Sequence, residues 1–150
     1  MENIKQILLI ALIRRVESLY SSSAYYALVI RMGEIRDKIV LSGSKKSDSI
    51  SALFDSASTY GSIDDQLTNE LGLYRTGKKM KYRIADGSIM EGEIVMGMVK
   101  IKGCEFPTLL ASRANNGEKL VIGHLTMQTM GIQLDPQNET YTVRCNIPRL

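Results

Sequence analysis

The stretch Ser51–Tyr60, which reads SALFDSASTY, decides the fold that this sequence predicts. Mostly apolar residues lead into Asp55, and small residues that carry hydroxyl groups follow it. This order is typical of a buried strand that ends in an acid and a tight turn. Such a strand would hold the Asp55 carboxylate rigidly at an edge of the core, where an ionised carboxylate needs partners or a shared proton.

The bulk composition predicts an ordinary globular domain. The chain has 150 residues, of which 23% are charged and 44% are hydrophobic, and this balance argues against disorder. The formal net charge is only +3, and Lys and Arg are scattered along the chain. A nucleic-acid-binding protein more often gathers its basic residues into a patch, so we expect no nucleic-acid partner.

The two cysteines and the single histidine are too few for most metal sites, which need three or four clustered ligands. We therefore expect no metal and no other cofactor. The spacing of Cys104 and Cys145 leaves a disulfide open. Free buried thiols in a reducing cytosol are the favoured reading, and with them a cytoplasmic location.

The N-terminal part of the chain contains one continuous apolar run, Ile7–Ile13. A membrane span takes roughly 20 residues, so this run predicts no span. Arg14, Arg15 and Glu17 follow at once and disfavour a secretion signal. We expect a helix from about Asn3 to Tyr20 instead, as an extension over residues 1–23 that precedes a domain over residues 24–150.

The first half of the domain predicts strands and one helix. Tyr25–Ile30, Ile35–Leu41 and Ile50–Phe54 read as strands, and Ser42–Ser49 reads as an exposed, mobile loop. Gly61–Leu73 has helical spacing, with Ser62 as a candidate N-terminal cap and Gly72 as the end.

A β-hairpin is predicted over Met80–Ile94. Apolar and basic residues alternate along its first strand, and the dipeptide Asp86-Gly87 favours a tight turn because glycine accepts a positive φ.

The second half of the domain predicts three further strands and a short helix. Ile94–Ile101 and Cys104–Leu110 read as strands, and Ala111–Lys119 reads as a polar loop. Leu120–Gly123 then reads as a buried strand that ends in glycine. A helix over His124–Met130 and a final strand over Glu139–Cys145 complete the chain.

Three motifs in this order resemble the retropepsin-like aspartic protease family, in its single-domain cellular and prokaryotic form. They are the loop at Asp55-Ser56-Ala57-Ser58, the hairpin at Asp86-Gly87, and the run Leu120–Asp135, in which an Ile-Gly pair precedes a short helix. The resemblance spans about residues 50–143. It implies an all-β closed barrel with one or two short helices, to which the N-terminal helix would be extra.

The resemblance implies a peptidase that works as a homodimer. Each chain has one such loop, so Asp55 of two subunits would meet across a two-fold axis, share a proton and activate water. Ser56 would bond across the pair, and Ser58 would line the floor of a peptide cleft. Ala85, Asp86, Gly87 and Ser88 would form the flap over the substrate.

Ala57 departs from the family pattern, which has glycine at that position. A natural or engineered inactive module that dimerises or binds peptides is therefore the alternative to an active peptidase.

The remaining candidates have simpler explanations. His124 is expected to be a cap or a surface residue. Retroviral members have an arginine at that position, paired with an acid just after the catalytic loop. Here these positions hold His124 and Thr59, so that ion pair is absent. Met90, Met96 and Met98 are expected to fill core gaps or to line an apolar cleft.

Overall fold

The computed structural model describes residues 33–147 apart from 85, 115 and 116, together with Lys5, Leu8 and Arg149. The expected helix over residues 3–20 and strand over residues 25–30 fall outside this part of the chain, so they stay predictions, as does the domain boundary after residue 23. The chain divides into two compact units, residues 1–35 with 134–141 and residues 36–133 with 142–150.

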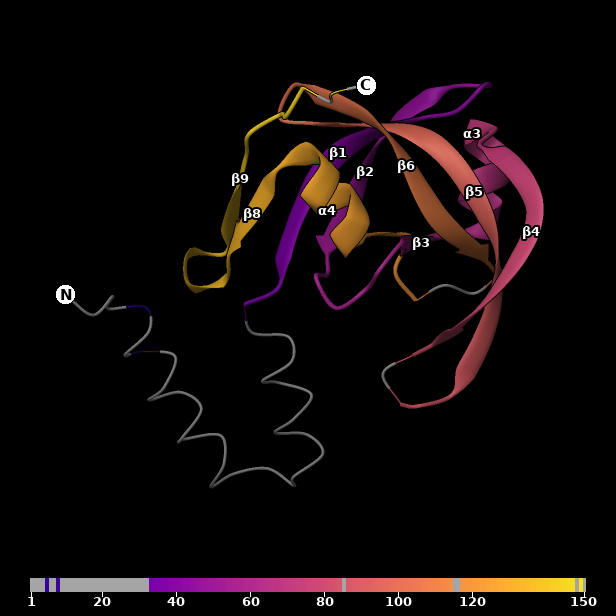
Figure 1. Ribbon diagram of the computed structural model, residues 1–150, viewed down its shortest axis with the longest axis horizontal. Helices are drawn as coiled ribbons and strands as arrows, with labels where there is room; N and C mark the ends of the chain where they lie inside the picture. The colour runs from indigo at the N-terminus through magenta and orange to yellow at the C-terminus, as the bar shows by residue number, and fades with distance from the viewer. Residues whose placement is uncertain are drawn as a thin grey trace. The chain divides into compact units, whose positions relative to one another are not determined.

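The main feature of the fold is a closed barrel (Figure 1). Seven strands form one sheet in the order β1-β2-β7-β3-β6-β5-β4, and β1 also pairs with β5, which closes six of them into a ring. The strands are β1 (Ile35–Ser42), β2 (Ser47–Phe54), β3 (Gly61–Asp64), β4 (Tyr74–Arg83), β5 (Ile89–Ile101), β6 (Cys104–Arg113) and β7 (Leu120–Ile122).

The barrel is mixed, because β2–β7 and β3–β6 are parallel pairs. The pairs β3–β7, β4–β5, β5–β6 and β1–β5 are antiparallel. Two short helices, α3 (Asp65–Leu71) and α4 (His124–Met130), accompany the barrel within the described residues. The predicted all-β closed barrel is confirmed.

The core follows the two-residue period of the strands. In β5, Val95, Val99 and Ile101 are buried, while Met96 and Met98 between them are exposed. Every strand of the barrel supplies such inward side chains, and fully buried examples are Leu41, Ile63, Val95, Leu110, Leu120 and Ile122.

The segment Gly61–Leu73 is a strand followed by a helix, which corrects the expected single helix. Gly61–Asp64 forms β3, paired with β6 and β7, and α3 begins only at Asp65. Ser62 therefore lies in a strand, and the N-cap position of α3 is Asp64. The predicted end is confirmed, because Gly72 takes a left-handed conformation at φ 72°.

The connection after β1 is shorter than the exposed loop expected over Ser42–Ser49. The strands extend to Ser42 and from Ser47, which leaves residues 43–46 as a turn. Backbone N–H groups of Ser44 and Lys45 donate to the carbonyls of Gly72 and Leu71, at 2.9 and 3.0 Å. These bonds fix the turn to the end of α3.

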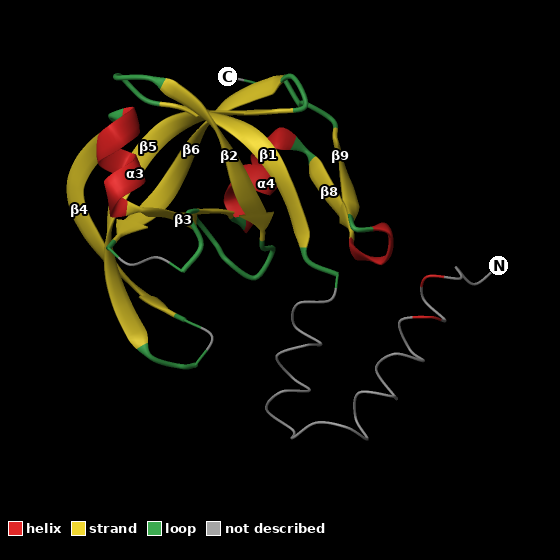
Figure 2. Cartoon of the chain, turned by 180° about the vertical axis from the view of Figure 1, so that it is seen from behind, coloured by secondary structure: helices red, strands yellow, loops and turns green. Residues whose placement is uncertain are grey.

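The predicted hairpin is confirmed, with β4 and β5 as its strands. They pair from Tyr74–Met96 to Arg83–Ile89, and Figure 2 shows them continuing past the barrel as a long arm. Gly87 lies in the turn with φ 88°. Tyr82 and Ile84 are half-buried, whereas Lys81 and Arg83 are exposed. The apolar and basic residues therefore lie on opposite faces of the hairpin, as expected.

The C-terminal part holds short elements. Strands β8 (Ile132–Asp135) and β9 (Thr140–Val143) form a two-stranded sheet, joined by the 3₁₀ turn Pro136–Asn138. The expected final strand over Glu139–Cys145 is thus shorter than predicted. No helix in the described part of the chain is long and apolar enough to cross a bilayer.

The cysteines are joined, which corrects the expected free thiols. Cys104, at the start of β6, forms a disulfide with Cys145, and their Cα atoms lie 5.5 Å apart. The disulfide removes one of the two supports for the expected cytoplasmic location, because stable disulfides are rare in the cytosol. The other support, the charged residues that follow the N-terminal apolar run, is unaffected, and the location stays a prediction.

Candidate active site

The end of β2 places Asp55 beside β7. Leu53 and Phe54 pair in parallel with β7, and the Asp55 N–H continues the ladder by donating to the Ile122 carbonyl at 3.0 Å. The chain then turns, because the Ser58 N–H donates to the Asp55 carbonyl at 3.2 Å. The Asp55 carboxylate accepts the Ala57 N–H at 2.9 Å. The acid is therefore held by its own loop, as the SALFDSASTY pattern predicted.

The loop is bound to the start of α4 by backbone hydrogen bonds. The His124 N–H donates to the Ser58 carbonyl at 2.6 Å, and the Leu125 N–H donates to the Thr59 carbonyl at 3.0 Å. The Ser58 hydroxyl accepts the Gly61 N–H at 3.1 Å. These bonds join the Asp55 loop to α4, and the His124 side chain is exposed, as expected of a surface residue.

Two glycines allow this close approach of the loop and β7. A Cβ on Gly123 would lie 2.4 Å from the Gly61 nitrogen, and a Cβ on Gly61 would overlap the Val121 carbonyl. Gly61 also has φ 80°, which side-chain-bearing residues rarely adopt.

Ala57 fits the loop without backbone strain. It is exposed, and it is not among the described non-glycine residues with positive φ, which are Lys102, Glu139 and Cys145. The position therefore does not need the conformational freedom of glycine within a single chain.

A hollow of about 740 Å³ lies between this loop and the hairpin. Its walls include Asp55, Ala57 and Ser58 from the loop, and Tyr82, Arg83 and Ile84 from the hairpin. A smaller hollow of about 340 Å³ shares Ala57, Ser58, Tyr82 and Arg83 with it. Asp55 thus faces a space of the size in which small ligands and peptide side chains bind.

The tip of the hairpin is ordered by its own polar groups. The Asp86 carboxylate accepts the N–H and the hydroxyl of Ser88, at 2.8 and 2.6 Å. The Ser88 hydroxyl and then the Ser88 N–H hold the pKa of Asp86 below its usual value. Asp86, Gly87 and Ser88 do not line the hollow in this chain, and Ala85 is outside the described residues.

Ser56 is exposed and also lies outside the lining of the hollow. Of the expected site residues, the structure therefore brings Asp55, Ala57 and Ser58 together. The catalytic and substrate-binding roles assigned to these residues stay predictions.

The sequence analysis assigned none of the other polar lining side chains to the site; these are Ser62, Tyr82, Arg83, Arg113 and Glu118. Arg113 is the last residue of β6, in a stretch that the sequence assigned to a loop. Glu118 accepts two hydrogen bonds from Arg36, at 2.6 and 2.8 Å, and this guanidinium lowers the pKa of Glu118. Tyr82 was recognisable as an inward residue of the hairpin, but its place beside Asp55 was not.

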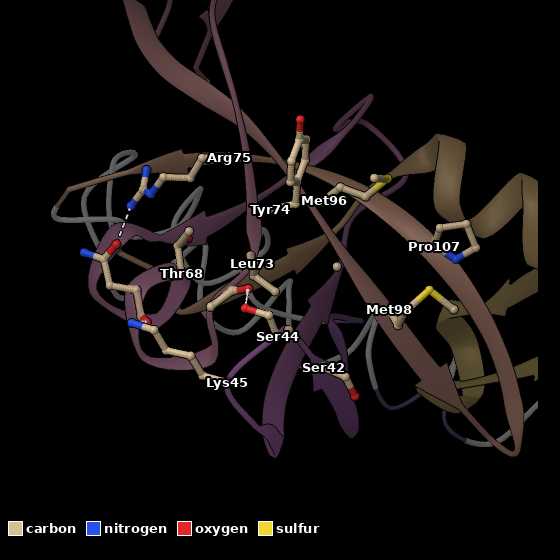
Figure 3. A pocket seen from close by; sticks show the side chains of 14 residues that line it. Ser42, Ser44, Lys45, Thr68, Leu73, Tyr74, Arg75, Met96, Met98 and Pro107 are labelled. Carbon is tan, nitrogen blue, oxygen red and sulfur yellow. Dashed lines mark hydrogen bonds between the residues drawn. The ribbon is translucent and has the colours of Figure 1, made fainter.

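A separate hollow of about 680 Å³ is lined by Met96 and Met98 of β5 (Figure 3). Met96, Met98 and Pro107 lie at one end and Ser44, Lys45 and Thr68 at the other. This hollow shares no lining residue with the one at Asp55. Met96 and Met98 do line an apolar space, but Met90 lines neither hollow.

Within the described ranges, no group of three or more His, Cys, Asp or Glu side chains is arranged to hold a metal ion. The arrangement at Asp55 instead presents one fixed carboxylate to a hollow that a hairpin borders.

Neither a protein-family model nor a curated protein sequence matches this chain. Solved structures do match. EIAV protease in complex with the inhibitor HBY-793 superposes with a TM-score of 0.53 at 14% identity, over 68% of this chain and 92% of that one. The retroviral protease-like domain of Ddi1 from Leishmania major gives 0.49 at 13% identity, over 72% and 85%. Simian foamy virus (mac) protease gives 0.41 at 12% identity, over 61% and 92%. The superposition on EIAV protease, together with the closed mixed barrel, shows that the chain has a retropepsin-like fold.

Proposed function

We propose that this protein is an aspartic endopeptidase that acts as a homodimer. The observation that carries the proposal is the position of Asp55, which lines the hollow between its own rigid loop and the β4–β5 hairpin. Hydrolysis of a peptide bond needs an activated water and a polarised carbonyl, and a pair of carboxyl groups that shares one proton supplies both.

The second carboxyl group would come from a second subunit. The barrel contains one loop of this kind, and an isologous dimer brings two copies of one residue to its axis. In that dimer, Asp55 of each chain faces its copy, and one carboxylate takes a proton from water while the protonated carboxyl donates to the substrate carbonyl. Ser56, which is exposed in the single chain, is then free to bond across the pair.

The hairpin would close over the substrate, with Ala85–Ser88 as the flap. Its tip is solvent-exposed at Asp86, Gly87 and Ser88 and is ordered by the bonds from Ser88 to Asp86. No metal or organic cofactor takes part in this mechanism. We expect no nucleic-acid partner, and we retain the cytoplasm as the proposed location.

The test is peptide cleavage measured as a function of pH, with and without pepstatin, a hydroxyl-containing mimic of the transition state. Activity should be highest at mildly acidic pH, where one of the two carboxyl groups is ionised, and it should fall on both sides. Asp55→Asn should abolish cleavage and leave the dimer intact by analytical ultracentrifugation. Cleavage that persists unchanged in Asp55→Asn would exclude Asp55 from the mechanism.

The alternative is a module that keeps the barrel and binds peptides without cleaving them. Ala57 favours it, because a Cβ at this position could crowd the peptide or the opposing loop. The alternative predicts no turnover at any pH, and none in Ala57→Gly. Activity that appears or rises in Ala57→Gly would identify an impaired enzyme.

A further inference from the structure

The hollow at Asp55 contains two buried polar atoms that have no hydrogen-bond partner among the described residues. They are the hydroxyl oxygen of Tyr82 and Nε of Arg113. Buried polar groups are nearly always paired, so each such atom calls for an explanation. Both residues line the same hollow as Asp55, so these two unpaired donors belong to side chains of the candidate site.

Arg113 and Tyr82 are neighbours across the hollow. The guanidinium carbon of Arg113 lies 5.8 Å from the centroid of the Tyr82 ring, a distance at which a cation and an aromatic ring attract each other. A Cβ on Gly92 would lie only 3.3 Å from the Tyr82 ring, so the glycine in β5 provides the room for it. The ring in turn confines the guanidinium.

The described residues supply no carboxylate to Arg113. Two acids line the hollow with it, and no ion pair between described residues joins either of them to Arg113: Glu118 pairs with Arg36, and Asp55 accepts the N–H of Ala57. The other cation of the hollow, Arg83, is exposed and donates to the carbonyl of Gly87 at 2.9 Å. Arg113 is therefore the half-buried cation of this site that lacks an anion.

We propose that Arg113 and Tyr82 form a carboxylate-binding subsite, which makes the hollow select peptides with an acidic group. A guanidinium matches a carboxylate with parallel N–H donors, and the Tyr82 hydroxyl can donate to a remaining lone pair. Arg113 is a specificity-determining residue in this scheme and takes no part in bond cleavage. The proposal depends on the proposed function only for its cleavage readout.

The experiment compares three peptide mixtures that differ only in their acidic group. Each is a fluorescent mixture of peptides with a randomised centre: one has Glu fixed at a flanking position and an amidated C-terminus, the second has Gln in place of Glu, and the third has Gln and a free C-terminal carboxylate. Kd is measured by fluorescence polarisation on Asp55→Asn, and kcat/KM on the unmodified protein, at pH 6.

We expect the Glu mixture, the free-acid mixture or both to bind more tightly than the amidated Gln mixture. The mixture that does so identifies a side chain or a C-terminus as the source of the carboxylate. Adding Arg113→Gln should weaken binding of that mixture about 10- to 100-fold, the range for a hydrogen bond to a charged group. Binding of the amidated Gln mixture should not change. Adding Tyr82→Phe should give a smaller loss in the same direction.

Arg83→Gln is the matched control, because it removes the same charge from the same hollow. It should leave the preference in place. The preference should also fade as the pH falls through the pKa of the peptide carboxyl group, which is about 4.3 for Glu and about 3.5 for a C-terminus. Thermal melting of each variant separates loss of binding from loss of fold.

Equal binding of all three mixtures would overturn the proposal, and so would equal losses in Arg83→Gln and Arg113→Gln. These outcomes are separable from the fate of the peptidase. Cleavage without an acidic preference would refute the subsite and keep the enzyme, whereas acidic preference in Kd without any cleavage would keep the subsite and refute the enzyme.

Discussion

At the scale of single residues, Gly123 determines how closely the Asp55 loop can approach β7. The nearest neighbours of a Cβ at this position are backbone atoms of Gly61, Tyr60 and Ser58, at 2.4 to 2.8 Å. Backbone atoms of a hydrogen-bonded loop cannot move aside as a flexible side chain can. Any side chain at position 123 therefore pushes the loop, and Asp55 with it, away from the barrel.

Gly123→Ala is expected to lower the free energy of unfolding by about 1–3 kcal/mol, the usual cost of forcing extra atoms into a packed site. Urea denaturation would measure it. Gly117→Ala is the matched control, because a Cβ there meets nothing within 4 Å and its φ is not positive. It should change stability by less than about 0.5 kcal/mol. Equal effects of the two substitutions would contradict the close-approach argument.

The sequence predicted Asp55 but not Arg113, and the reason lies in what fixes each residue. Asp55 is marked locally, by apolar residues before it and hydroxyl-bearing residues after it. Arg113 lies in a polar segment without a strand pattern. It joins β6 because Ser62, Ile63 and Asp64 of β3 pair in parallel with its end. That pairing joins segments about fifty residues apart, and no local pattern reveals it.

At the scale of elements, the β4–β5 hairpin was predictable because its alternation and its Asp86-Gly87 turn are both local. The β3–α3 boundary was not. Ile63 continues the four-residue spacing of Leu67 and Leu71, so the pattern fits a longer helix equally well. Ile63 is instead fully buried in β3, a strand of four residues. A strand this short does not reveal its two-residue alternation in the sequence. Tertiary pairing overrides the helical pattern here.

Arg75 links α3 to the hairpin strands. Its guanidinium donates to Asp65 at 2.9 Å, to Asn69 at 2.8 Å and to Glu93 at 3.0 Å. The bond from Arg75, followed by one from Ser112, holds the pKa of Asp65 below its ordinary value of 3.8. A carboxyl group whose pKa is lowered by folding stabilises the protein at pH values above its ordinary pKa. This contribution is lost as the pH falls through the folded-state pKa.

Arg75→Gln is therefore expected to destabilise the protein most at pH 5–7 and less as the pH falls below about 4. The Asp65 side chain is 40% exposed and so is screened by solvent, which limits the effect of this pair to about 1 kcal/mol or less. Urea denaturation at a series of pH values measures the difference. Lys100→Gln, at an exposed position of β5, should show no such pH dependence. If the loss of unfolding free energy in Arg75→Gln instead grew toward low pH, this explanation would be wrong.

The Cys104–Cys145 disulfide joins the start of β6 to the segment after β9, across 41 residues. Closing a loop of this length restricts the unfolded chain, and the chain-entropy model gives about 4 kcal/mol for it. The double substitution Cys104→Ser and Cys145→Ser should lower the free energy of unfolding by up to this amount, measured in urea. A reductant should do the same to the unmodified protein and nothing to the double variant. Unchanged stability in both cases would mean that the bond adds little to the fold.

At the scale of the whole molecule, the proposed site requires two chains, and a mixing experiment tests this directly. Unmodified protein and Asp55→Asn are combined in equal amounts under conditions that exchange subunits. Random pairing leaves the unmodified chains about half as active as before mixing, because about half of them then have an inactive partner. Activity that stays proportional to the unmodified chains would show that one subunit is sufficient, and the dimeric mechanism would be wrong.

The strand β5 changes its neighbour within a few residues. Met96 still pairs with Tyr74 of β4, and Met98 already pairs with Ser42 of β1, with the buried Gly97 between them. Along this edge, the part of β5 before Gly97 therefore pairs with β4, and the part after Gly97 pairs with β1. A Cβ at Gly97 would meet Leu73 at 2.6 Å and Ser42 at 3.1 Å, so the close packing at this point leaves no room for a side chain. The change of neighbour along β5 therefore requires glycine at position 97, beside the hollow that Met96 and Met98 line.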